Sequence, residues 1–65
     1  MSYQIDLENI VHRNNNATNF GAQLLRLVIK ADMHNLRLLE KGFPNAVKTV
    51  QEWRETSVIP DYEYD

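Results

Sequence analysis

Five basic side chains at helical spacing are the residues of this sequence whose chemistry could serve a partner. On a helix of about 100° per residue they fall within an arc of about 80°. At a rise of about 1.5 Å per residue, the row they form is about 22 Å long. This basic stripe consists of Arg26, Lys30, His34, Arg37 and Lys41. It could bind an acidic protein or follow a phosphate backbone, or it could be only the solvated face of an amphipathic helix.

The sequence contains no recognisable catalytic or metal-binding set, and we expect a non-enzymatic protein without a cofactor. It has no cysteine, which excludes thiolate nucleophiles, thiolate metal sites and disulfides. Asp32 and His34 project more than about 100° apart on a helix, so they cannot act as a local pair. His12 has no ligand-type residue at i+3 or i+4, and no phosphate-binding loop or nucleophile elbow occurs.

The basic stripe needs a helix to present it, and the apolar periodicity predicts one long central helix over residues 19–41. Apolar residues at i, i+3, i+4 and i+7 form its folding face. They are Phe20, Leu24, Leu27, Val28, Ala31, Leu38 and Leu39. Asn16 or Thr18 would supply the N-cap oxygen. Asn35, inside the apolar arc, either bonds to neighbouring backbone or pairs across a helix interface and fixes its register.

A second apolar flank lies between the folding face and the basic stripe of the predicted helix. It consists of Leu25, Ile29, Met33 and Leu36. One packing partner does not cover so wide an apolar arc, and a large exposed apolar patch usually marks an interface. Because a chain of 65 residues buries only a modest core, we expect this flank to be the self-interface of a symmetric homodimer. Docking of a different protein there is the alternative.

The exit from the central helix predicts a tight turn into another helix, so that the two form a helical hairpin. Gly42 would take the left-handed position after the helix, Phe43 would plug the corner, and Pro44 suits the first turn of the next helix. That helix is expected over residues 44–55. Its apolar side consists of Ala46, Val47, Val50 and Trp53.

The two ends of the chain complete a single all-α domain over residues 1–65. A short helix is expected over residues 6–13 with Asp6 as its N-cap, a strand from Tyr3 to Leu7 being the alternative. Residues 57–65 form an acidic tail, which could lie along the basic stripe. The N-terminus has acids where a signal peptide would have bases, and no apolar run is long enough to span a bilayer. We therefore expect a cytoplasmic protein without membrane contact.

One motif pattern resembles a known group of proteins. Lys30-Ala31-Asp32, Asn35, Leu39, Gly42-Phe43-Pro44, Val47 and Trp53 stand at a spacing similar to that of small uncharacterised helical proteins encoded by bacteriophages and prophages. The resemblance covers residues 20–56 and includes no catalytic motif. It implies a small accessory protein in a bacterial cytoplasm, which would be the host cytoplasm if the protein is phage-encoded.

These observations together predict a homodimeric protein-interaction module that uses its dimer surface and basic stripe to bind an acidic protein. A small nucleic-acid-binding regulator is the alternative. The net charge of −2 and the lack of an aromatic residue among the bases as a stacking platform favour it less.

Overall fold

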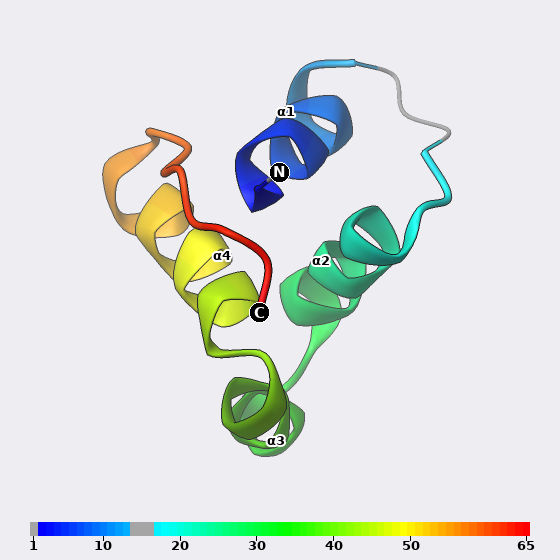
Figure 1. The fold of residues 1–65 in the computed structure, drawn as a ribbon. Helices are drawn as coiled ribbons and strands as arrows, with labels where there is room; N and C mark the ends of the chain where they lie inside the picture. Colours follow the sequence, from blue (N-terminus) through cyan, green and yellow to red (C-terminus); the bar gives the residue numbers. More distant parts are fainter. Residues whose placement is uncertain (1, 14–16) are drawn as a thin grey trace.

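The computed structural model describes residues 2–13 and 17–65. Within these residues the chain forms four helices. In chain order they are α1 (Tyr3–His12), α2 (Phe20–Lys30), α3 (Met33–Gly42) and α4 (Pro44–Thr56). Figure 1 shows α1, α2 and α4 around the centre of the molecule, with α3 at the end where α2 and α4 converge. The predicted all-α class is confirmed.

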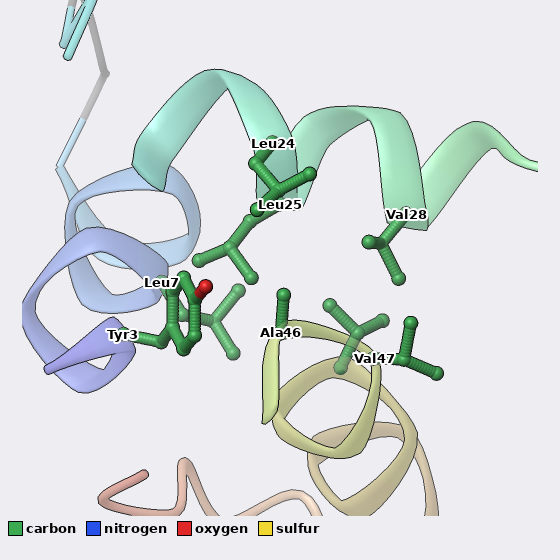
Figure 2. Packing of buried hydrophobic residues seen from close by; sticks show 8 residues of the cluster. Tyr3, Leu7, Leu24, Leu25, Val28, Ala46 and Val47 are labelled. Atoms are coloured by element: carbon green, nitrogen blue, oxygen red, sulfur yellow. The ribbon is translucent and has the colours of Figure 1, made fainter. Parts of the chain in front are cut away.

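The hydrophobic core lies between α1, α2 and α4 (Figure 2). Its buried members are Tyr3, Leu7, Leu24, Leu25, Val28, Ala46, Val47 and Val50. The predicted apolar side of the last helix is thus largely confirmed, with Trp53 packing against the core while only partly buried. Thr49 is also fully buried, and its hydroxyl donates to the Asn45 carbonyl at 2.7 Å, which satisfies it inside the helix.

The prediction of one long central helix is wrong, because the chain leaves the helix at Ala31 and Asp32. Asp32 is the N-cap of a new helix, and its carboxylate accepts a hydrogen bond from the Asn35 backbone amide at 2.8 Å. Aspartate is unfavourable within a helix and favourable at an N-cap, because its short side chain competes for nearby backbone amides. The end of α2 is stabilised from outside: the Arg54 guanidinium donates to the Ile29 carbonyl at 2.6 Å.

The start of the chain also differs from the prediction. α1 begins at Tyr3 with Ser2 as its N-cap, so both the Asp6 cap and the alternative strand are wrong. Asn19, and not Thr18, occupies the N-cap position of α2, while Asn16 lies outside the described residues. The Asn19 side chain makes no cap hydrogen bond and instead donates to the Asp6 carboxylate at 2.9 Å. These polar groups join α1 to the start of α2.

The turn after α3 is as tight as predicted, with Phe43 alone between two helices and Pro44 opening α4. Gly42, however, is the last residue of α3 and has no positive φ. Among the described residues other than glycine, the left-handed conformation occurs at Ser57, which ends α4 with a φ of 62°. The glycine is therefore not needed for the backbone of this turn.

The acidic tail does not follow the basic stripe. It runs back beside α4 and α1 and ends near the start of α4 (Figure 1). The Tyr3 amide donates to the Tyr62 carbonyl at 2.9 Å. The Asp65 carboxylate accepts from the Asn45 and Ala46 amides at 2.8 and 3.1 Å, and from the Tyr3 hydroxyl at 2.8 Å. Since Phe43, the N-cap of α4, has no side-chain oxygen, Asp65 caps this helix from the tail that follows it.

A second set of tail contacts surrounds Asp6, whose side chain is buried in α1. The Tyr64 hydroxyl donates to this carboxylate at 2.6 Å, and the hydrogen bond, together with burial, raises the pKa of Tyr64 to about 12. Burial and the hydrogen bond to Asp65 raise the pKa of Tyr3 to about 12 as well. A Cβ on Gly21 would overlap the Asp6 carboxylate, so α2 can approach here only with glycine. We call the residues Tyr62–Asp65 and these contacts the tail clasp.

Candidate functional site

α3 is an amphipathic helix that carries large apolar side chains and yet has no buried residue. It packs mainly on α4, which leaves its side toward α2 open. Leu38 on α3 and Leu27 on α2 are each 52% exposed. Burying one leucine side chain is worth about 1.5 to 3 kcal/mol, so a partner that covered these two side chains would gain a substantial binding energy.

The open side forms a groove between α2 and α3. One hollow of about 490 Å³ and a second of about 580 Å³ adjoin each other, because both are lined by Leu27, Leu39 and Phe43. We call them together the α2–α3 groove. Its apolar lining consists of Phe20, Leu24, Leu27, Ala31, Leu38, Leu39 and Phe43.

Phe43 and Gly42 give the groove its shape at the α3–α4 turn. The Phe43 ring is partly buried and packs against the exposed Phe20 ring, with centroids 5.9 Å apart and planes at 52°. The predicted apolar plug at this corner is therefore present. Gly42 lines the groove, and a Cβ built there would meet no atom within 4 Å. The absence of a side chain at residue 42 keeps this end of the groove open.

The predicted self-interface does not exist as one exposed flank. Leu25 is fully buried in the core, because the α2 face that carries it packs toward the other core helices. Ile29 and Leu36 are partly buried against the same core, and only Met33 is largely exposed. The break at Ala31 and Asp32 is the physical reason, since residues before and after it no longer share a helix face.

The basic stripe is divided by the same break. The Arg26 guanidinium donates to the Ala17 carbonyl at 2.8 Å, whereas Lys30 lines the groove at the end of α2. Only His34, Arg37 and Lys41 remain together, exposed on one side of α3. The structure therefore replaces a row of five bases by a group of three on α3, none of which lines the groove.

The sequence did not predict a groove, because its lining residues on α2 and α3 were expected to form the buried face of one continuous helix. Leu27, Leu38 and Leu39 have the periodicity of core residues, and the periodicity does not show where a helix changes direction. One signal was available: Asp32 stands three residues before Asn35, the spacing of an N-cap carboxylate and the amide it accepts.

Among the residues that the structure describes, no three His, Asp or Glu side chains are placed to hold a metal ion. None of the helices in that part of the chain is long and apolar enough to cross a membrane. No protein-family model, curated protein or solved structure matches this chain.

Proposed function

We propose that this protein is a small non-enzymatic interaction module that binds another protein in the α2–α3 groove. The observation that carries the proposal is α3 itself, a helix with no buried residue whose Leu38 faces an open apolar hollow. Exposed apolar surface gathered at a groove is typical of a site that is covered by a partner. The proposal depends on this surface and requires no reactive group.

Two other expectations are part of the proposal. The resemblance over residues 20–56 supports a phage or bacterial accessory protein that acts in a bacterial cytoplasm. The homodimer was predicted from an exposed apolar flank, and that flank is not present because Leu25 is buried. Self-association is therefore a prediction without an assigned surface, and the solution mass of the chain over a dilution series tests it.

A nucleic-acid-binding regulator is the second candidate, because His34, Arg37 and Lys41 are exposed together on α3. Contacts of Arg37 and Lys41 to two phosphates would release counterions, and the affinity should fall about 12-fold between 50 and 200 mM salt. A duplex or single strand that binds with this salt dependence, and that loses affinity with Arg37→Ala, would support this candidate. No binding at low salt would refute it.

The test of the main proposal is a selection of random peptides from a display library on the immobilised full chain. Gly42→Leu is the matched variant, because residue 42 has open space around its Cβ and a longer side chain there would fill the groove. Gln51→Leu adds the same side chain at an exposed position of α4 that does not line the groove. Thermal unfolding of both variants shows that they are folded.

We expect enriched peptides with apolar residues at helical spacing, which bind the original chain and Gln51→Leu equally. Their affinity for Gly42→Leu should be at least about tenfold lower, the loss that corresponds to about 1.4 kcal/mol of blocked contact. Peptides that bind Gly42→Leu as well as the original chain, or no enrichment at all, would refute the groove as the binding site.

A further inference from the structure

A third hollow, of about 360 Å³, adjoins the α2–α3 groove and has a different lining. Its aromatic side chains are Tyr3, Phe20, Phe43 and Tyr64. The Tyr3 and Tyr64 rings meet edge to face, with centroids 4.8 Å apart. Among the described residues that line this hollow, Asp65 is the only charged one. We call it the aromatic hollow. Aromatic rings and a carboxylate are both electron-rich, and together they are the groups that bind an organic cation.

A second carboxylate, that of Asp6, lies directly behind this lining. The hydroxyl of the lining residue Tyr64 donates to it at 2.6 Å, and a Cβ on the lining residue Gly21 would overlap it. Asp6 is buried, and its donors among the described residues are the Tyr64 hydroxyl and the Asn19 amide, which are both neutral. A buried carboxylate is unfavourable without a positive charge nearby. A cation in the hollow would supply that charge.

The charge of Asp65 is offset only in part. The described groups that donate to its carboxylate are the Asn45 and Ala46 amides and the Tyr3 hydroxyl, and all three are neutral. The N-terminus of α4 contributes about half a positive charge at this place. Because Asp6 and Asp65 together carry two negative charges, the aromatic hollow remains negative.

We infer that the aromatic hollow binds the ammonium group of a lysine on the protein that occupies the α2–α3 groove. The Phe20 and Phe43 rings line both the groove and the hollow, so a groove-bound helix has the hollow beside it. Phe20 is 70% exposed, so the hollow does not enclose a small free amine as a ligand pocket would. A lysine attached to a bound helix is instead held there at a high effective concentration. This inference rests on the proposed function.

The hydrogen bonds of Asp65 favour lysine over arginine. A carboxylate has about four acceptor sites. Oδ2 accepts from the Ala46 amide and the Tyr3 hydroxyl, and Oδ1 accepts from the Asn45 amide, so among the described contacts one site on Oδ1 is left. An ammonium is compact and can use a single acceptor, whereas a guanidinium binds a carboxylate best through two parallel hydrogen bonds.

The site can be tested without the groove by three small probes, the acetylated methylamides of lysine, norleucine and arginine. The first two share an aliphatic stem and differ in the ammonium group. Binding to the full chain is followed by amide chemical shifts in an NMR titration. We expect the lysine probe to shift the Gly21, Phe43 and Tyr64 amides in a saturable way. The norleucine probe should bind at least about threefold more weakly, and the arginine probe should also bind more weakly than the lysine probe.

Variants of the chain separate the charge from the rings. Asp65→Asn retains an acceptor oxygen and loses the charge, so it should weaken the lysine probe about threefold. Asp61→Asn, the same change at an exposed residue that does not line the hollow, should have no effect. Phe20→Leu keeps an apolar side chain and removes a ring, and it should weaken the lysine probe about threefold, whereas Phe20→Trp should strengthen its binding. Thermal unfolding shows that each variant is folded.

Peptides selected on the groove test where the lysine comes from. Each lysine of a selected peptide is replaced by norleucine, and the dissociation constants are measured by fluorescence anisotropy. One replacement should weaken binding by about threefold or more, since an exposed ion pair and a cation–π contact are lost together. The same replacement should cost less when the chain carries Asp65→Asn, because the lysine has then already lost its counter-charge.

The outcomes distinguish this inference from the proposed function. A norleucine probe that binds as tightly as the lysine probe, or the absence of any saturable shift, would overturn the ammonium site and leave the groove proposal standing. Groove-bound peptides that tolerate norleucine at every lysine would do the same. An arginine probe that binds as tightly as the lysine probe would overturn the assignment to lysine. A lysine probe that binds as expected, while the library selection enriches no peptide, would refute the groove and with it the partner's lysine.

Discussion

Replacing Asp65 by alanine tests whether the tail clasp holds the fold together. The substitution removes the carboxylate that accepts hydrogen bonds from the Asn45 and Ala46 amides and from the Tyr3 hydroxyl. Loss of an N-cap costs about 1 kcal/mol, and loss of a negative charge at a helix N-terminus costs about 0.3 to 1 kcal/mol. The hydroxyl of the buried Tyr3 loses its acceptor, at a further cost of about 1 kcal/mol.

The free energy of unfolding should fall by about 2 kcal/mol. This is less than the sum of these costs, because Asp65 is exposed and water can replace part of the hydrogen bonding that its carboxylate provides. A 65-residue domain has about 3 to 10 kcal/mol of stability in total. The same loss lowers the melting temperature by about 10 °C. Urea unfolding can be followed by the fluorescence of Trp53, the single tryptophan of the chain, which packs partly buried against the core.

Two further variants make this prediction specific. Asp61→Ala removes an exposed acid from the same tail, for which the described structure gives no hydrogen bond, and it should change the stability by less than about 0.5 kcal/mol. Asp65→Asn retains an acceptor oxygen and loses the charge, so its loss of stability should lie between those of Asp65→Ala and Asp61→Ala. If Asp65→Ala unfolds at the same urea concentration as Asp61→Ala, the reasoning about the clasp is refuted.

Three other predictions concern the packing of the helices and the tyrosines. Gly21→Ala should destabilise the fold by about 1 to 3 kcal/mol in urea unfolding, because its Cβ overlaps a buried carboxylate, whereas Gly42→Ala, with open space around it, should be neutral or stabilising by up to about 1 kcal/mol. Asp32→Ala removes the cap of α3 and should cost about 0.5 to 2 kcal/mol, measured as lost helicity and a lower urea midpoint. The raised pKa values of Tyr3 and Tyr64, about 12 against 10.0 for a free tyrosine, mean that the folded state holds both protons more tightly. Their stabilisation should be complete below pH 10 and lost between pH 10 and 12, so the urea midpoint should fall over that range, and it should fall less in Tyr3→Phe.

The features of the fold that are set by residues close together in the sequence could be predicted. Pro44 fixed the start of α4 within one tight turn, and the spacing of Ala46, Val47 and Val50 identified its buried side. Both signals act within a few residues, where backbone geometry and helical periodicity decide the outcome. Gly42 shows the limit of such signals, since a glycine after a helix has several uses, and here it leaves open space beside a groove.

The tail clasp could not be predicted, because its contacts join residues that are far apart in the sequence: about sixty positions for those to Tyr3 and Asp6, and about twenty for those to the start of α4. The sequence shows an acidic, tyrosine-rich tail and a basic helix, and on charge alone the tail would be expected to lie along that helix. The structure places the Asp65 carboxylate at the unsatisfied amides of α4, and the Tyr64 hydroxyl against Asp6. Each of these groups has a stronger requirement for a hydrogen bond than an exposed lysine has for a counter-charge, since exposed ion pairs contribute well under 1 kcal/mol.

The break at Asp32 is the feature on which the candidate site depends. In a continuous helix Leu27 and Leu38 would lie about 16 Å apart along one convex surface. They could not then form the two walls of a hollow. With α3 turned away from α2, the same two side chains line one hollow together with Phe43. The break leaves backbone groups without helical partners, and the Asp32 carboxylate and the Arg54 guanidinium satisfy groups on its two sides. The groove therefore depends on the break, and the break depends on the Asp32 cap. A substitution that weakens this cap should reduce the affinity for a groove-bound helix as well as the stability of α3.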